Sequence, residues 1–143
     1  MTNPRDLPST PDEFNARSHG RLPGLVGMEI LEIEPGRALA RLDVRPDLLA
    51  PNGYLHAATV IALADTCCGY GCTVSFPDGA TGFTTVEIKT NFLSTVLEGG
   101  IACHAWLVHG GRTTQIWDAE VTAEATGKKI ALFRCTQMLL YPR

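Results

Sequence analysis

Apolar and polar residues alternate along two short segments in the first third of the chain and predict a β-hairpin. Residues 28–34 and 37–44 flank the pair Pro35-Gly36, and in the second segment alanine, leucine and valine occupy every second position. A period of two is typical of a strand with one buried face, and Pro-Gly is a turn signal. Residues 45–53, with two prolines and an Asn-Gly pair, predict a loop after the hairpin.

The C-terminal half contains four more strand-like segments, at about residues 81–93, 100–109, 113–125 and 129–141. The glycine-containing pairs at 110–111 and 126–127 separate the last three segments and predict hairpin turns. In the third segment, apolar residues from Trp117 to Ala123 occupy alternate positions, and the positions between them are acidic or threonine. One face of the predicted sheet is therefore packed and the other faces water.

Between the two groups of strands lies an apolar segment, at about residues 55–71, that contains no proline. It is too long for a typical strand, and a helix that is apolar on nearly every side belongs in the middle of a domain. Gly69 and Gly71 are predicted to mark the end of this helix.

Strands on both sides of a lone apolar helix indicate an α+β fold, in which an antiparallel sheet of about six strands wraps around one long central helix. Residues 12–25 predict a short helix and a connector. We therefore divide the chain into a partly helical N-terminal extension, residues 1–24, and a single domain, residues 25–143. A chain of 143 residues is long enough to bury a core without staples.

Composition and charge exclude several classes of protein. The formal net charge is −3, which argues against a nucleic-acid-binding protein, because such a protein would carry a basic surface. The five cysteines, an odd number without zinc-site spacing, are interpreted as small buried thiols in a reducing cytoplasm, so we expect no metal. We expect no signal peptide in residues 1–11, and the apolar run at 57–64 is shorter than the roughly 20 residues that span a bilayer. We expect a cytoplasmic protein without nucleic-acid or membrane partners.

Asp65 is the one carboxylate within the apolar helical segment. Burying a carboxylate is unfavourable unless it is hydrogen-bonded or protonated. One interpretation is structural: Asp65 bonds a nearby hydroxyl such as Thr59 or Thr66, or faces a cleft. The other is catalytic: Asp65 is a general base or nucleophile whose reactivity depends on dry surroundings.

His56 lies nine residues before Asp65, and the two side chains cannot easily act on the same atom within one chain. They point to opposite sides of the helix and are separated by roughly 13 Å along its axis. This geometry favours a symmetric homodimer with antiparallel central helices, so that each site combines residues of both chains. Backbone N–H groups near His56 and Ala57 lack partners within the helix and could stabilise a developing oxyanion. For His56 itself, an orienting role competes with direct proton transfer. A base and an oxyanion donor together suit acyl transfer to water.

The motif formed by Gly53, His56-Ala57-Ala58 and Asp65 resembles the signature of hotdog-fold acyl-CoA thioesterases. It is most similar to the group that contains the phenylacetate-degradation thioesterases and the Arthrobacter-type 4-hydroxybenzoyl-CoA thioesterase. The resemblance extends over about residues 25–141 and includes LADT at 63–66, NFL at 91–93, HGGRT at 109–113 and GKKIALFR at 127–134.

The resemblance implies roles for individual residues. In similar enzymes the acid on the central helix attacks the thioester or activates water, which falls here on Asp65. A backbone N–H of the other subunit polarises the carbonyl, which falls on Ala57, with His56 orienting the turn. A hydroxyl on the following strand helps to hold water or the acid, which implies Thr85, with Thr84 as the neighbouring alternative. The family also implies a homodimer or a dimer of dimers, and no cofactor, because coenzyme A is part of the substrate.

The predicted substrate-binding residues surround the helix start, the following strand and the last two turns: Asn52, Gly53, Ala58, Phe83, Thr84, Arg112, Lys128 and Lys129. The last three could bind the coenzyme A phosphates or could be solvated turn charges. Phe83 could line the acyl pocket or pack in the core.

Two positions depart from the family pattern. The usual His-Gly-Gly is replaced by His56, Ala57 and Ala58, which preserves the backbone donor but adds methyl groups that can narrow the substrate channel. The usual asparagine or glutamine six residues before the histidine is replaced by Ala50, and the nearest amide is that of Asn52.

The leading hypothesis is hydrolysis of an aryl- or medium-chain acyl-CoA to a carboxylate and free coenzyme A. Because of the two departures, the alternative is a non-catalytic acyl-CoA-binding protein that acts as a sensor or carrier. A hydratase or dehydratase shares the fold but is disfavoured, because the sequence lacks the Asp and His about five residues apart that mark the hydratases.

Overall fold

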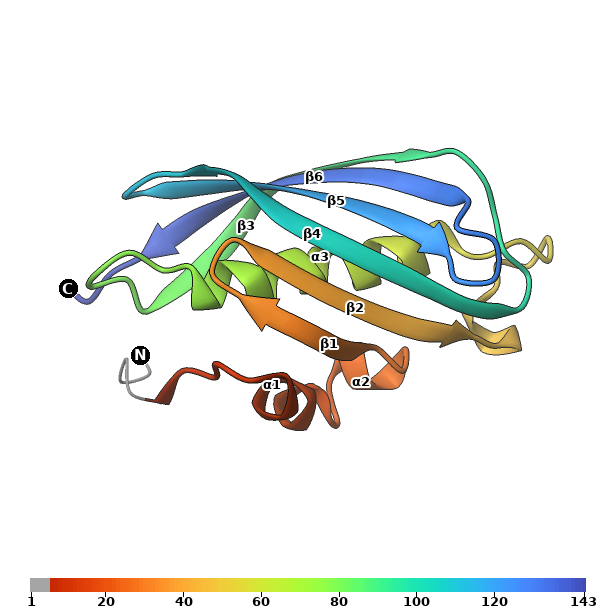
Figure 1. The fold of residues 1–143 in the computed structure, drawn as a ribbon, viewed down its shortest axis with the longest axis horizontal. Helices are drawn as coiled ribbons and strands as arrows, with labels where there is room; N and C mark the ends of the chain where they lie inside the picture. Colours follow the sequence, from red (N-terminus) through yellow and green to blue (C-terminus); the bar gives the residue numbers. More distant parts are fainter. Residues whose placement is uncertain (1–5) are drawn as a thin grey trace.

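In the computed structural model, which describes residues 6–143, a six-stranded antiparallel sheet curves around one long helix (Figure 1). The helices and strands are α1 (Pro11–Ser18), α2 (Leu22–Leu25), β1 (Glu29–Glu34), β2 (Arg37–Val44), α3 (Ala57–Val74), β3 (Gly82–Phe92), β4 (Gly99–Gly110), β5 (Thr114–Ala123) and β6 (Lys129–Leu140). The order of strands is β1-β2-β4-β5-β6-β3, and every neighbouring pair is antiparallel. The predicted α+β architecture is confirmed, and each strand begins and ends within two residues of its predicted bounds.

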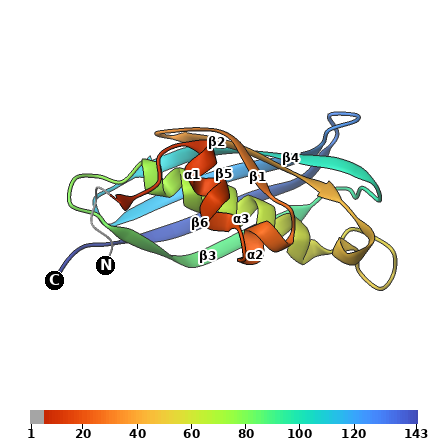
Figure 2. The same cartoon turned by 90° about the horizontal axis from the view of Figure 1, so that it is seen from below.

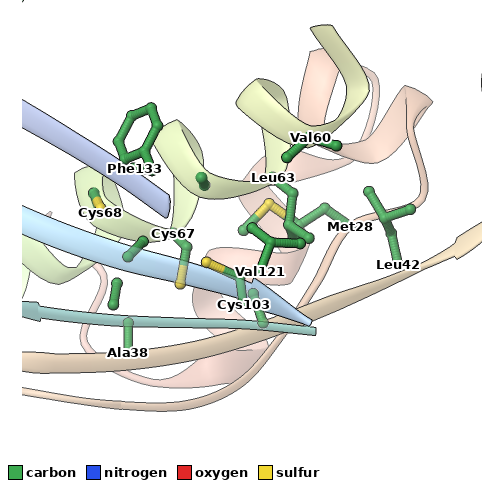
Figure 3. Packing of buried hydrophobic residues seen from close by; sticks show 14 of the residues in the cluster. Met28, Ala38, Leu42, Val60, Leu63, Cys67, Cys68, Cys103, Val121 and Phe133 are labelled. Carbon is green, nitrogen blue, oxygen red and sulfur yellow. The ribbon is translucent and has the colours of Figure 1, made fainter. Parts of the chain in front are cut away.

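Helix α3 is the core of the domain and contacts all six strands. By length and composition it could also cross a membrane, but here Val60, Leu63 and Cys67 are buried against the sheet (Figure 3). On β5, the alternate residues from Trp117 to Ala123 are buried as predicted. The interpretation of the cysteines as buried thiols is confirmed, because all of them are free and buried: Cys67, Cys68, Cys72, Cys103 and Cys135.

Gly69 and Gly71 do not end the central helix, so that part of the prediction is wrong. Helix α3 continues to Val74, because both glycines face aromatic rings of the sheet. A Cβ atom at Gly69 would lie 2.9 Å from the ring of Phe83, and one at Gly71 would lie 2.7 Å from the ring of Trp117. The absence of a side chain at these positions lets the rings contact the helix backbone directly.

The N-terminal helices cover the side of α3 that faces away from the sheet (Figure 2). Helix α1 begins with a capping box between Thr10 and Glu13, in which each side chain accepts a hydrogen bond from the other residue's backbone N–H. Phe14 packs against Tyr70 of α3 with ring centroids 4.6 Å apart, and Ser18 shares a 2.7 Å hydrogen bond with the Tyr70 hydroxyl. The predicted short helix is thus found, and it contributes Phe14 to the domain's own core. Residues 1–5 of the predicted extension lie outside the described residues.

Strand β3 ends the sheet and has an unpaired edge within this chain. A bulge between Thr85 and Glu87 shifts its register against β6. Beyond the bulge, Ile88 and Phe92 pair with the buried side of β6 and yet remain 43% and 47% exposed. An edge strand with exposed apolar side chains is a surface suited to pairing with another chain.

Candidate active site

Helix α3 starts at an exposed loop, where the side chain of His56 caps its first turn. Nδ1 of His56 accepts a hydrogen bond from the N–H of Ala58 at 2.9 Å, and its carbonyl accepts from the N–H groups of Thr59 and Val60. The N–H of Ala57 has no hydrogen-bond partner in the part of the chain that the structure describes, and Ala57 is exposed. One backbone donor is therefore free at the positive end of the α3 dipole.

The loop before α3 is fixed by hydrogen bonds to the carbonyl of Leu48. This oxygen accepts from the backbone N–H of His56 at 3.1 Å and from the hydroxyl of the buried Thr59 at 2.9 Å. The N–H of Leu55 donates to the hydroxyl of Thr95 at 3.2 Å. These contacts hold the residues on both sides of Ala57, so the free N–H points in a defined direction.

Two predicted binding residues, Asn52 and Gly53, lie at the exposed tip of this loop. The side-chain oxygen of Asn52 accepts a hydrogen bond from the N–H of Tyr54 at 3.2 Å, and Gly53 has a φ of +89°, which favours glycine. The Asn52 oxygen therefore stabilises the loop itself. Ala50 is joined to the same turn, because its N–H donates to the carbonyl of Tyr54 at 2.7 Å.

Asp65 lies half-buried in the middle of α3. Its Oδ1 is enclosed and has no hydrogen-bond partner among the described residues. The structural interpretation through Thr59 is wrong, because the Thr59 hydroxyl donates to Leu48 instead. Loss of hydration disfavours the charged carboxylate, so burial raises the pKa of Asp65. A half-buried, unpartnered carboxylate with a raised pKa is suited to accept a proton during a reaction.

Thr85 lies on β3 at the same level as Asp65. Gly69 of α3 lies against the ring of Phe83 of β3, which fixes the position of the strand along the helix. Helix α3 and strand β3 run in opposite directions (Figure 1). Asp65, four residues before Gly69, and Thr85, two residues after Phe83, are therefore both displaced from this contact toward the start of α3. The two displacements are also similar in length, about 6 Å along the helix and about 7 Å along the strand. Thr85 is on the inner side of β3, since it pairs with the buried Gln137.

Thr84, the neighbouring alternative, faces the outer side of the sheet, where it pairs with the exposed Met138. Alternation along the strand therefore separates Thr84 from Asp65. Phe83 faces inward, and its half-buried ring also meets Phe76 edge-on with centroids 6.4 Å apart.

The three predicted phosphate-binding cations do not form one cluster. Arg112 lies at the turn between β4 and β5, whereas Lys128 and Lys129 lie at the turn between β5 and β6. The length of β5 separates the two turns by about 30 Å. Lys129 forms a 3.1 Å ion pair with Glu120. Lys128 borders a cavity of about 290 Å³ with Thr95, and Thr95 in turn bonds the loop that leads to the helix start.

The sequence patterns did not single out Thr95 or Gln137 as part of this region. Gln137 carried a recognisable signal, because the period of two along β6 places an amide among the inward-facing Phe133, Cys135 and Leu139. Thr95 lies in a loop without periodicity, and only the folded structure brings it to the helix start.

The sequence over residues 52–130 matches the family described as the thioesterase superfamily. The chain belongs to this superfamily. A 1,4-dihydroxy-2-naphthoyl-CoA hydrolase of Listeria monocytogenes is 32% identical over 111 residues, which cover 78% of this chain and 89% of that protein. The acyl-coenzyme A thioesterase PaaI of Escherichia coli is 24% identical over 110 residues, covering 76% and 75% of the two chains.

Solved structures also include two variants of a Staphylococcus aureus protein, one of them described as a thioesterase enzyme. That variant superimposes with a TM-score of 0.79 at 26% identity, over 85% of this chain and 98% of the other. It carries alanine in place of glutamine, and the second variant carries alanine in place of glutamate fifteen positions later. This member of the thioesterase superfamily is thus a thioester hydrolase with the hotdog fold, as the sequence motifs indicated.

Proposed function

We propose that this thioesterase hydrolyses an acyl-CoA carrying an aryl or medium-chain acyl group and releases the carboxylate and free coenzyme A. The observation that carries the proposal is the enclosed, unpartnered Oδ1 of Asp65 on the helix whose exposed start presents the free N–H of Ala57. The names of the Listeria and Escherichia relatives, one an aryl-CoA hydrolase and one an acyl-coenzyme A thioesterase, support coenzyme A thioesters as the substrate class.

In this proposal Asp65 acts as general base or nucleophile, and the Ala57 N–H stabilises the oxyanion that forms on the thioester carbonyl. One oxyanion donor contributes about 100- to 1000-fold in rate, and a positioned base about 100- to 10,000-fold. His56 holds the first turn of α3 in place through its bond to Ala58. Lys128, at the end of the sheet near the helix start, is the better-placed cation for the coenzyme A phosphates.

The Staphylococcus variants support the assignment of the acid. Their altered glutamine and glutamate are fifteen positions apart, which is the spacing of Ala50 and Asp65 in this chain. In this proposal Asp65 takes the role of that glutamate, and Ala50 stands at the position that corresponds to the glutamine. The proposed chemistry here then proceeds without a glutamine side chain at that position.

A symmetric dimer through the β3 edge fits a site shared between two chains. Glu87 lies at the centre of β3. Measured along the axis of α3, Glu87 lies beside the helical turn that precedes Asp65. A twofold axis at Glu87 would bring the partner's helix start to within about 3 Å of Asp65 along the helix axis. Pairing would also cover the exposed Ile88 and Phe92. Exposed Leu132 and Met138 on the outer face of the sheet support a further association into a dimer of dimers.

The first experiment is a panel of aryl- and straight-chain acyl-CoA thioesters assayed for released thiol. We expect turnover of at least one class, and we expect Asp65→Asn to fold normally and lose most of it. Full activity in Asp65→Asn would remove Asp65 from the mechanism. Saturable acyl-CoA binding without thiol release would instead support the sensor or carrier alternative.

The shared site is tested by mixing two inactive variants, Ala57→Pro and Asp65→Asn. If each site uses Ala57 of one chain and Asp65 of its partner, a mixed dimer contains one fully native site. Random mixing of equal amounts then restores about a quarter of the native activity. If the mixture stays as inactive as the separate variants, the two residues act within one chain.

A further inference from the structure

Gln137 is a fully buried amide whose main hydrogen bond goes to an exposed residue. Its side chain is 0% exposed, and its Oε1 accepts a hydrogen bond from the hydroxyl of Thr85 at 2.7 Å. Among the described residues, its Nε2 donates only to the sulfur of Cys135, at 3.4 Å. Burying an amide is unfavourable unless its hydrogen bonds are made, and a sulfur is a weak acceptor. The bond from Thr85 satisfies the buried Oε1 of Gln137, and it also fixes the direction in which the Thr85 proton points.

The neighbouring Gln115 shows what a structural glutamine does in the same sheet. It pairs with Gln137 across β5 and β6. Its Oε1 accepts from the indole N–H of the buried Trp117 at 2.8 Å, and its Nε2 donates to the carbonyl of Ser75 at 2.9 Å. Both polar ends of Gln115 therefore satisfy core groups that would otherwise lack partners. Gln137 differs, because its carbonyl points toward the β3 edge and the Asp65 level.

The bond to Gln137 decides what Thr85 offers to a ligand. A threonine hydroxyl has one proton and two lone pairs, and the proton of Thr85 is given to Gln137. Thr85 can therefore only accept a hydrogen bond from a group beside it. Asp65 at the same level, when ionised, also accepts only. Two acceptors at one level favour a donor between them, and a water molecule supplies two donors.

We propose that Gln137 is a positioning residue that holds Thr85 as a hydrogen-bond acceptor, so that Thr85 and Asp65 together orient the water that attacks the thioester. The inference rests on the proposed function and selects the general-base role of Asp65 over the nucleophilic one. The water donates one hydrogen bond to Asp65 and the other to Thr85, which directs a lone pair of its oxygen toward the carbonyl carbon.

The step balances without any further reactant. Asp65 takes a proton from the water as the C–O bond forms, and the electrons of the carbonyl bond move to the oxygen held by the Ala57 N–H. The tetrahedral intermediate then collapses, the C–S bond breaks, and the departing coenzyme A sulfur takes the proton from Asp65. The products are the carboxylic acid and the free thiol.

The test uses Gln137→Met, Thr85→Val and the double variant, with Thr136→Val on the outer face of β6 as the matched control. We expect Gln137→Met and Thr85→Val each to lower kcat about tenfold, the effect of one ordinary hydrogen bond, with KM changed less than twofold. The double variant should lose no more than either single variant, because both remove the same contact. Thr85→Ser should retain activity, and Thr136→Val should match the native enzyme.

The pH profile separates positioning from a structural defect. In Gln137→Met the Thr85 proton is free to donate to the Asp65 carboxylate, which lowers the pKa of Asp65 and moves the acid limb of kcat/KM to lower pH. The charged residues Glu87 and Lys89 of β3 face the outer side of the sheet and do not share this position. A merely loosened core would leave the acid limb in place.

Several results would overturn the inference. These are native kcat in Gln137→Met, losses that multiply in the double variant, Thr85→Ser as impaired as Thr85→Val, or an unmoved acid limb. If Gln137→Met does not fold, the pair Thr85→Val and Thr85→Ser decides the matter, since Thr85 is exposed. Asp65→Asn is measured in parallel: if it is active, the proposed site fails as a whole. If it is inactive while Gln137→Met is native, only the role of Gln137 fails.

Discussion

Replacing Ala57 with proline should remove the oxyanion donor while leaving the helix start intact. Proline lacks the backbone N–H, and the N–H of Ala57 is the one amide of the first turn without a partner among the described residues. Ala57 is the first residue of α3, the position where proline is best tolerated. The residue before a proline must be extended, and His56 already has φ of −65° and ψ of 134°.

The structure predicts opposite effects on rate and on stability. Loss of one oxyanion donor lowers kcat about 100- to 1000-fold, or about 3 kcal/mol in the activation barrier. The fold loses no hydrogen bond, and proline restricts the unfolded chain, so the free energy of unfolding should stay constant or rise by about 0.4–1 kcal/mol. A catalytic loss of this size without a stability loss separates the role of the amide from damage to the helix.

The assay measures released thiol together with thermal unfolding of the same preparation. Ala57→Gly is the matched control, because it keeps the N–H and removes only the methyl group; its rate should stay near the native value. Product coenzyme A binding, measured by calorimetry, checks that the proline ring does not block the site. If Ala57→Pro binds coenzyme A, unfolds at the native temperature and still turns over within threefold of the native rate, the oxyanion assignment is refuted.

Three further predictions concern the acid, the core glycines and the thiols. Burial raises the pKa of Asp65, so the unfolded chain ionises it more readily and its contribution to stability declines as pH rises from the ordinary aspartate pKa through the raised value. Asp65→Asn should therefore melt higher than the native protein at neutral pH, with the difference closing in acid; a lower melting temperature at neutral pH would contradict this sign. Gly71→Ala should lower the free energy of unfolding by about 1–3 kcal/mol in urea, because its Cβ would lie 2.7 Å from Trp117; native stability would show that the ring can move aside at no cost. A thiol reagent should not label the native protein but should label five cysteines after unfolding, since burial raises the pKa of Cys72 to about 12 and of Cys68 well above its usual range; rapid labelling of the native protein would contradict it.

The spacing of apolar residues was sufficient to predict the fold, because the strands bury every second residue and the central helix is apolar on nearly every side. The period-two segments became strands, and the segment around Asp65 became the core helix. The error at Gly69 and Gly71 has a physical cause: a glycine that ends a helix and a glycine that admits an aromatic ring look alike in sequence. Only the position of Phe83 and Trp117 in the folded sheet distinguishes the two.

From the sequence, a site residue could be predicted only where its type was unusual for the segment that contains it. Asp65 was conspicuous as a carboxylate in an apolar segment, and the free N–H near His56 followed from helix geometry. The sequence could not choose between Arg112 and Lys128 as phosphate-binding cations, because the end of the sheet at which each residue lies follows from the turn that carries it. The choice between Thr84 and Thr85 needed the register of β3 against β6, which no local pattern determines.

The alanines at positions 57 and 58 fit this structure well, although glycine is usual in the resembled family. Both residues are in the first turn of α3, and neither has the positive φ that would require glycine. In a helix, alanine is more favourable than glycine by about 1 kcal/mol, because glycine loses more backbone entropy. The N–H of Ala57 stays free and that of Ala58 stays bound to His56, so the donor pattern of the turn is unchanged. Alanine here therefore holds the proposed oxyanion donor in a more rigid turn. We expect the exposed methyl groups to affect which acyl groups can enter the proposed site, and to leave the proposed chemistry itself unchanged.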